Sequence, residues 1–365
     1  MKNFKTVTAV AVIVAMQFVI TVSPASAQQA TVDNTHHAAV ADTKPAAAVG
    51  ETKPVTWDNW VRAESDKMFK SYADLGGFGK FFNIRKPTPI DAQKVIRMNR
   101  DTLYSFGIFD LTTPVTITKP DTGDRFQSIM VLNQDEYVPI AVVYKPGKYT
   151  LTQKKVGSRY VFVAIRTFVD SSDPADIKKA NALQDKIKVR QSSVGKFEIP
   201  NWDQKSQDKL RTAIQVLAST MKNFRGSFGT KEEVDPIAHL LGAASGWGGN
   251  PVKDAKYLND VPKMNDGKTA YTLTVKDVPV NGFWSISLYN GKGYFVQNQY
   301  NAYSINNITA KKDKDGGVTI HFGGDPKQSN YLPIMDGWNY AVRLYQPRKE
   351  ILDGKWKFPA PKLVK

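Results

Sequence analysis

Side chains able to act as nucleophiles, general bases or soft metal ligands are scarce in this sequence. Its 365 residues include four histidines and no cysteine. Most nucleophile-activating pairs and most zinc sites use those two residue types, so the composition excludes cysteine catalysis and disfavours mononuclear zinc hydrolysis. We therefore predict no metal and no cofactor. Whether the protein is an enzyme is left open by the composition.

The catalytic candidates of a hydrolase are Ser245 and His239, which stands six residues before it. The neighbouring pair Gly248 and Gly249 could supply backbone donors for an oxyanion. The segment differs from the Gly-x-Ser-x-Gly nucleophile elbow, because Gly242 stands three residues before Ser245 and no strand is expected there. The resulting hypothesis is a carboxylesterase-like enzyme.

His239 and His321 are the histidines in sequence that we expect to be ordered. On a helix opened by Asp235-Pro236, His239 lies about 200° from Ile237 and is expected to point away from the apolar stripe. His321 alternates with apolar neighbours on a predicted strand, so it is expected to face outward.

Arg166 is the most informative charged residue, because it shares a predicted strand face with Tyr160, Phe162, Ala164 and Phe168. A guanidinium there must be paired or line a hydrated cavity, since an unpaired buried charge is costly. Asp101, Asp110 and Asp135 are its candidate partners. Two alternatives stay open: a buried ion pair that ties the sheet to the loop after Arg97, or an arginine that binds an anion.

Two further segments carry polar and aromatic residues where function is often found. In the loop 97–102, Asn99 and Asp101 can hydrogen-bond their own backbone, which indicates a turn, but loops on a rigid β scaffold also carry binding residues. One face of the last strand is polar and aromatic, which suits a sugar ring or a carboxylate. We predict a ligand site formed by Arg97, Asn99, Asp101, Tyr104, Arg166, Asn339, Arg343 and Tyr345.

Three long motifs contain these residues: Ile96–Tyr104, Asn281–Asn290 and Gly337–Pro347. In this order they resemble the signatures of two paired families, domain of unknown function 1254 and domain of unknown function 1214. The resemblance covers nearly the whole chain after its N-terminal segment. It implies an N-terminal 1254-like and a C-terminal 1214-like β domain, and no particular reaction.

Periodicity predicts the elements that position the candidate residues. A helix is expected from Thr56, as its cap, to Gly76-Gly77. Alternation of apolar and polar residues then predicts strands at 115–117, 126–132, 138–144, 149–152 and 159–169. Helices are expected near 173–187, 204–224 and from 235 onward. Strands return at 271–275, 283–289, 294–298, 318–322 and 338–345.

This order predicts a mainly β fold with two antiparallel β-sandwich or jelly-roll-like domains, joined by a helical segment and preceded by an N-terminal helix. The predicted divisions are a signal peptide at 1–27, a disordered linker at 28–53, an N-terminal β domain at 54–190, connecting helices at 191–255 and a C-terminal β domain at 256–365.

The N-terminus predicts export. Lys2 and Lys5 precede an apolar run to about Val22, and Ala25-Ser26-Ala27 is typical of a signal peptide cleaved after Ala27. The run is shorter than the ~20 residues that cross a membrane, so we expect a periplasmic or secreted protein without a transmembrane segment. His36 and His37 lie in the predicted linker.

The net positive charge of the chain indicates which classes of binding partner to expect. The formal net charge of +16 falls to +14 once Lys2 and Lys5 are removed. An exported protein rarely meets a genome, so we expect no nucleic acid. The tail from Tyr340 to Lys365 carries seven basic and two acidic residues, which makes an anionic envelope polymer a candidate partner.

Three functions follow as hypotheses. The leading one is binding of a small molecule or glycan through loops near Asn99, Asp101 and Arg166. The second is a hydrolase that uses Ser245 and His239, or a glycosidase-like carboxylate pair drawn from Glu64, Asp101, Asp110, Asp135 and Glu136. The third is a structural envelope protein. A homo-oligomer is a candidate assembly for each.

Overall fold

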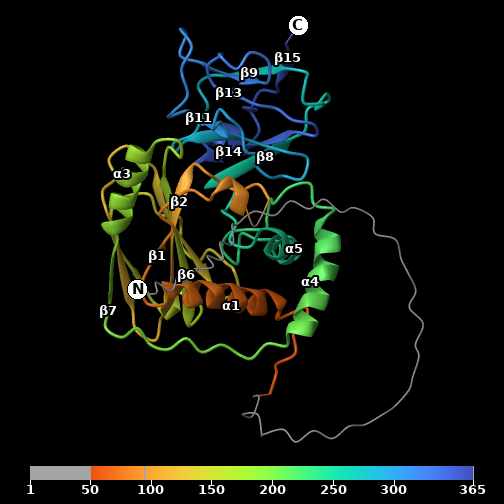
Figure 1. Cartoon of the computed structure of the whole chain (residues 1–365). Coiled ribbons are helices and arrows are strands. Elements are labelled where there is room, and N and C mark those ends of the chain that lie inside the picture. The colour runs from red at the N-terminus through yellow and green to blue at the C-terminus, as the bar shows by residue number, and fades with distance from the viewer. Residues whose placement is uncertain (1–50, 94–95, 365) are drawn as a thin grey trace, which may run out of the picture.

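The chain is known from a computed structural model, which describes residues 51–93 and 96–364. Figure 1 shows two β-rich halves, an N-terminal half with strands β1–β7 and a C-terminal half with strands β8–β15. The predicted signal peptide, most of the predicted linker, and His36 and His37 lie outside the described residues. Within the described ranges, no helix combines the length and apolar character that crossing a bilayer requires.

The N-terminal half is built from two antiparallel sheets. The first has the strand order β1 (Phe82–Asn83), β2 (Thr102–Asp110), β6 (Tyr160–Phe168), β4 (Gln127–Asn133). The second has the order β5 (Gly147–Leu151), β3 (Val115–Lys119), β7 (Lys188–Gln191). The sheets share one core, in which Val163 and Ile165 of β6 cluster with Val115 and Ile117 of β3. Branched side chains at alternate positions of these strands therefore hold the sheets face to face.

The other face of the first sheet is covered by helix α1 (Trp60–Tyr72). Phe69 and Tyr72 lie on its buried stripe, as helical spacing requires. The ring of Tyr72 lies 4.6 Å from that of Phe106 and 5.0 Å from that of Phe162, between centroids. This aromatic layer fixes β2 and β6, the strands that carry Tyr104 and Arg166.

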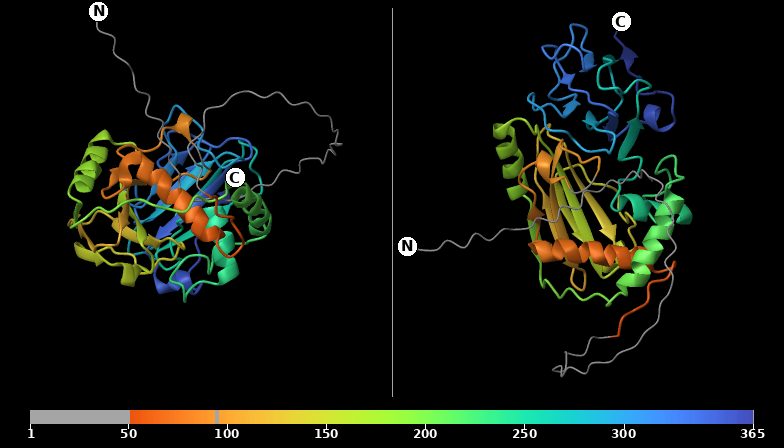
Figure 2. Two further views of the ribbon diagram at one scale, coloured as in Figure 1. Left: turned by 90° about the horizontal axis from the view of Figure 1, so that it is seen from below. Right: turned by 45° about the vertical axis from the view of Figure 1, so that its right-hand side comes forward.

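Helices α4 (Gln204–Ala218) and α5 (Pro236–Gly246) pack beside α1, as Figure 2 shows. Each begins at an aspartate cap, because Asp203 accepts from the backbone N–H of Ser206 and Asp235 from that of Ile237. Fully buried Trp60 lies in the cluster that joins the three helices, and its indole donates to the Gln207 carbonyl. The helical pair is therefore held against the N-terminal half.

The C-terminal half also has two sheets facing each other. Their strand orders are β11 (Ser304–Asn306), β10 (Trp284–Tyr289), β14 (Asn339–Tyr345), β8 (Ala255–Asp260) and β13 (Tyr331–Leu332), β12 (Val318–Phe322), β9 (Tyr271–Val275), β15 (Lys362–Leu363). Only the β12–β13 pairing is parallel among the named strands of the described chain. Ile286 and Val342 of the first sheet share a core with Leu273 and Ile320 of the second.

Short helical elements complete the described chain: α2 (Gln153–Val156), α3 (Pro174–Asp185), α6 (Lys349–Leu352), a π-helical turn (Ala73–Gly77) and a 3₁₀ turn (Ile90–Ala92). The prediction of a mainly β protein with antiparallel sheets is confirmed.

The structure corrects several predicted elements. The first helix begins at Trp60 instead of Thr56, and Trp57 is 76% exposed. Ordered contacts begin before Thr56, because the backbone of Lys53 donates to the Asn201 carbonyl and accepts from the Asp203 N–H. The segments 138–144 and 294–298 form no named strand. In the first, Val143 makes an isolated antiparallel bridge to Ile129 of β4, and Val138 donates to the Gly229 carbonyl of a loop.

The two halves meet where the loop 97–101 lies against β10 and β14. Arg343 of β14 donates to the carbonyls of Arg97 and Met98, at 2.8 and 3.2 Å. The Tyr289 hydroxyl also donates to the Met98 carbonyl at 2.8 Å. Below this contact, Phe126 and Tyr345 belong to one aromatic cluster that crosses the junction. Residues of both halves therefore position the loop.

A buried ion pair closes the far end of β2. The side chain of Asp110 is 0% exposed and binds Arg159 through its two oxygens, with a shortest distance of 2.9 Å. Burial is the largest single influence on the pKa of Asp110 and raises it. The hydrogen bonds from Arg159 and from the backbone N–H groups of Thr112 and Lys196 together outweigh burial, so the pKa is lowered. Asp110 is thus a partner of Arg159 and not of Arg166.

We predict that Asp110→Asn lowers the free energy of unfolding by about 2 kcal/mol, less than for a fully buried pair because Arg159 remains 37% exposed. The lowered pKa gives the ion pair a stabilising effect that is complete above the ordinary aspartate value and is lost as pH falls through the folded-state value. Urea unfolding at pH 7 and near pH 3 tests both points. An equal loss of stability at both pH values would contradict the assignment.

Candidate functional site

Arg166 lies at the junction of the halves, in a layer of tyrosines. Its guanidinium carbon is 5.6 Å from the ring centroid of Tyr104, its antiparallel neighbour on β2, and the side chain is 3% exposed. Burial acts against the charge, but Tyr104, Tyr257 and Tyr345 outweigh it and raise the pKa of Arg166. The guanidinium therefore stays charged at the centre of the molecule.

The acidic partners predicted for Arg166 have other contacts, which corrects the prediction. Asp135 pairs with Arg62 at 2.6 Å, and Asp110 pairs with Arg159. Asp101 accepts from Ser304 at 3.2 Å and from Asn306 at 3.3 Å. Burial raises the pKa of Asp101 even though the charge of Arg343 opposes the shift. Asp101 therefore ties the loop to β11.

Asn99 joins the same layer. Its amide donates to the hydroxyl of Tyr345 at 2.9 Å and to that of Thr102 at 3.1 Å, and its carbonyl accepts from the Asp101 backbone. Burial and the neighbouring tyrosines raise the pKa of Tyr345 well above its ordinary value, against the charges of Arg343 and Arg166. Tyr345 is therefore a neutral phenol that connects Asn99 to β14.

Asn339 is the predicted site residue that the structure places elsewhere. It is 4% exposed and donates to the Asn290 carbonyl at 2.7 Å, at the opposite end of β14 from Tyr345. The remaining seven predicted residues lie on or next to the loop 97–101 and its contacts. Of these seven, Arg97 also lines a cavity.

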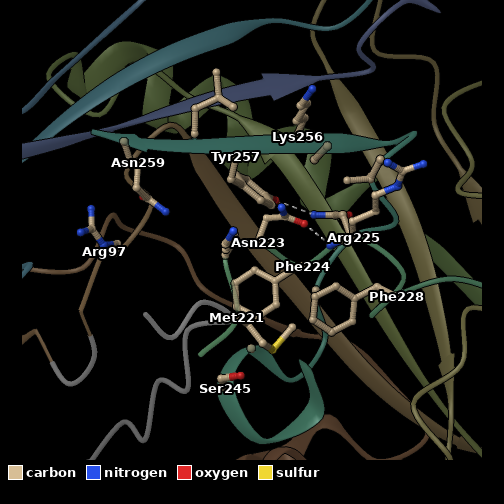
Figure 3. Close-up of a pocket in the computed structure, with 18 of the residues that line it drawn as sticks. Arg97, Met221, Asn223, Phe224, Arg225, Phe228, Ser245, Lys256, Tyr257 and Asn259 are labelled. Carbon is tan, nitrogen blue, oxygen red and sulfur yellow. Dashed lines mark hydrogen bonds between the residues drawn. The ribbon is translucent and has the colours of Figure 1, made fainter. Parts of the chain in front are cut away.

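That cavity, hereafter the junction pocket, has a volume of about 740 Å³. Figure 3 shows strand β8 on one side, with Tyr257 pointing toward Met221 and Phe224 of the segment after α4 and Lys256 pointing away from them; Phe228 lies beside Phe224. Arg97 enters at one end of the view and Ser245 of α5 lies beneath. The size falls within the range of about 300–1,000 Å³ typical of small-molecule sites.

Positive charge is the main electrostatic feature of the junction pocket. Its lining contains Arg97, Lys222, Arg225 and Lys256, and no aspartate or glutamate among the described residues. None of the four cations belongs to an ion pair found in the described part of the chain. The Lys256 ammonium donates to the Ile351 carbonyl at 2.9 Å. The pocket therefore has a positive potential that no acid of its wall neutralises.

The guanidinium of Arg97 lies 5.8 Å from the ring centroid of Tyr289 but is incompletely hydrogen-bonded. Its Nε and Nη1 atoms are buried without a hydrogen-bond partner within 51–93 and 96–364. Its backbone has a φ of 54°, in the left-handed region that non-glycine residues rarely adopt. Burial, with a contribution from Arg343, lowers the pKa of Arg97 although Tyr289 opposes it. A buried donor without an acceptor carries a free-energy cost that an acceptor would remove.

Tyr257 connects the junction pocket to the layer around Arg166. It lines the pocket, and its hydroxyl accepts from the Asn250 amide at 2.8 Å. Burial raises the pKa of Tyr257, and the charge of Arg166 acts in the opposite direction. Tyr257 therefore belongs both to the pocket wall and to the surroundings of Arg166.

The structure does not support Ser245 and His239 as a catalytic pair. His239 is 4% exposed instead of pointing outward, because the loop 227–229 and Tyr137 cover that side of α5. Its two ring nitrogens lie 2.9 Å from the carbonyls of Ser227 and Asp135, which cannot donate a proton. The Ser245 hydroxyl donates to the Leu241 carbonyl within its own helix. His321, by contrast, is half-buried and bonds to the Ser329 carbonyl.

The glycines after Ser245 serve packing and not an oxyanion. The Gly248 N–H donates to Glu136 at 2.6 Å, and burial raises the pKa of that carboxyl well above its ordinary value. A Cβ at Gly249 would lie 2.2 Å from the Phe228 ring, and one at Gly242 would lie 2.6 Å from Ser227. The absence of a Cβ at Gly242 and Gly249 therefore lets the segment after α4 pack closely against α5.

Sequence reasoning missed most of the pocket wall. Lys256 and Tyr257 lie on β8, whose alternation is too weak to predict a strand. Met221 and Phe224 were assigned to a helix that ends at Ala218 in the structure. The available signal was the segment 221–228, in which Lys222 and Arg225 stand among Met221, Phe224 and Phe228.

The fold and the site define a class of two-part proteins in which a pocket lies between the halves. The chain belongs to the family that pairs the two domains predicted above. The family described as protein of unknown function DUF1254 matches residues 78–191, and the family described as protein of unknown function DUF1214 matches residues 257–349. The junction pocket takes residues from both matched segments and from the segment between them.

A solved structure shows the same fold. The VPA0106 protein from Vibrio parahaemolyticus superimposes with a TM-score of 0.65 at 18% identity, over 85% of this chain and 98% of that one. A putative uncharacterized protein from Burkholderia cenocepacia gives a TM-score of 0.48 at 14% identity, over 85% and 87%. No curated protein matches the chain.

The packing of Phe228 on Gly249 gives a prediction. Gly249→Ala should lower the free energy of unfolding by about 1–3 kcal/mol, because the added methyl group overlaps the ring. In a Phe228→Leu background, which removes the overlapping ring atoms, the same change should cost at least 1 kcal/mol less. Chemical unfolding of the four proteins of this cycle measures the coupling. Additive effects would show that the two residues do not press on each other.

Proposed function

We propose that the protein binds a small anionic molecule in the junction pocket. The observation that carries the proposal is the set of four cations on the pocket wall, Arg97, Lys222, Arg225 and Lys256, with no acidic residue of the described lining among them. Elsewhere in the described chain, arginines such as Arg62, Arg125 and Arg159 are matched by aspartates. Cations gathered without counter-charges favour an anion from outside the chain.

The same wall disfavours the hydrolase alternatives at this pocket. A glycosidase needs two carboxyl groups across its site, and the described lining provides none. Ser245, which does line it, has no base within its hydrogen bonds, because its hydroxyl donates to Leu241. Binding without turnover is therefore the function that the geometry supports best.

The predicted setting of this binding activity also stays a proposal. Export follows from the N-terminal signal pattern and cleavage after Ala27, and a β-sandwich or jelly-roll description of each half is supported by its two facing sheets. A homo-oligomer and a role in holding an anionic envelope polymer rest on the sequence alone.

Export gives a direct prediction. Protein recovered from the producing cells should begin at Gln28 when its N-terminus is determined by mass spectrometry, and it should fractionate outside the cytoplasm. The intact mass under native conditions reports the subunit number in the same experiment. A chain that retains Met1 and stays in the cytoplasm would contradict export.

Anion binding is tested by calorimetric titration with three acids and their neutral counterparts: octanoate and 1-octanol, benzoate and benzyl alcohol, galacturonate and galactose. At least one acid should bind more tightly than its neutral partner, by about tenfold or more. Lys222→Gln/Arg225→Gln should weaken the binding of that acid by a similar factor, because both residues line the pocket.

The matched control is Lys205→Gln/Lys209→Gln, which removes two exposed charges from α4 outside the described lining. It should leave the affinity unchanged. Equal binding of acids and neutral partners, equal loss in both double variants, or no binding of any acid would each overturn the proposal.

A further inference from the structure

The neutral polar groups of the junction pocket are mostly hydrogen-bonded to the protein itself, which distinguishes the pocket from a site that binds a sugar. The hydroxyls of Ser219 and Ser245 both donate to backbone carbonyls of α4 and α5. The Asn223 side-chain oxygen accepts from the Arg225 backbone at 2.9 Å, and the Asn250 amide donates to Tyr257. Five of the six neutral polar side chains in the described lining are thus already engaged with the protein; Asn259 is the sixth.

The remaining wall is apolar. Met221, Phe224 and Phe228 are each half-buried, and the two phenylalanine rings lie 5.6 Å apart between centroids at an angle of 30°. Val252 and Leu352, on the same lining, are 40% and 38% exposed. Contacts with apolar parts of a ligand would remove this surface from water, whereas ring hydroxyls of a sugar would have few free partners.

We propose that the ligand of the junction pocket is a carboxylic acid with an apolar body, either an aliphatic chain or an aromatic ring. This inference rests on the proposed anion-binding function and names its ligand class. The carboxylate lies beside Arg97, the half-buried cation of the pocket wall. The apolar body lies against Met221, Phe224 and Phe228, on the opposite side from β8 in Figure 3.

This arrangement also accounts for the position of the surrounding cations. Lys222 and Arg225 are exposed residues of the same segment that carries the apolar side chains. They attract the carboxylate from solvent, whereas half-buried Arg97 binds it within the pocket. A second charged group on the ligand would meet the apolar wall without a partner, so one acidic group is the composition that fits.

The closing experiment titrates octanoate, benzoate, galacturonate and 1-octanol into three variants by calorimetry. Met221→Gln/Phe224→Tyr places polar atoms on the wall at nearly constant volume. Arg97→Gln removes the guanidinium, and Arg190→Gln removes an exposed arginine from β7 as the control. Circular dichroism and thermal melts establish that each variant is folded.

Octanoate or benzoate should bind the unmodified protein about tenfold more tightly than galacturonate and 1-octanol do. Met221→Gln/Phe224→Tyr and Arg97→Gln should each weaken the favoured acid by about tenfold, and Arg190→Gln should not. Galacturonate binding as tightly as the apolar acids, or no effect of the wall variant, would overturn the ligand class while leaving anion binding intact. Octanol equal to octanoate, or no binding of any acid, would overturn both.

Discussion

The contact on which the molecule depends is the burial of the Arg343 guanidinium between its two halves. Arg343 is 0% exposed and donates to Ser287, to Tyr289 and to the carbonyls of Arg97 and Met98. Oxygen atoms from both halves thus solvate one charge, which makes its burial tolerable. Neighbouring tyrosines outweigh burial and raise the pKa of Arg343 above its usual range. Together with the contacts of Asn99 and Asp101, this charge holds the loop 97–101 at the junction.

Holding the loop by its carbonyls explains why the side chain of Arg97 enters the pocket. A left-handed backbone at a non-glycine residue costs of order 1 kcal/mol, and the hydrogen bond from Arg343 to the Arg97 carbonyl offsets it. The Arg97 N–H is also fixed, since it donates to the Gly293 carbonyl at 2.7 Å. With both backbone groups bound to the C-terminal half, the orientation of the guanidinium is set by the junction and not by the loop alone.

The residues around Arg166 were more predictable from the sequence than the wall of the junction pocket. Arg166, Tyr104, Asn99 and Tyr345 could be brought together in advance, because period-two alternation places side chains on strand faces and the loop is adjacent in sequence. The pocket could not. Its wall depends on Lys256 of a weakly patterned strand and on the packing of Phe228 against Gly249, a contact between residues 21 positions apart that no local pattern encodes. The same long-range packing explains the error at His239: helical periodicity cannot foresee that another loop covers its polar face.

Tyr257 connects the buried charge of Arg166 to the junction pocket. Tyr257 of β8 lines the space that the ligand would occupy and interacts electrostatically with Arg166, and its phenol accepts from Asn250, which also lines that space. Because Arg166 is buried, its charge is screened less than a charge at the surface would be. Arg166 therefore adds to the positive potential of the pocket without touching its contents, whereas Arg97 can contact them directly. A buried cation behind a neutral tyrosine strengthens attraction for one anion and leaves the apolar wall free to discriminate by shape.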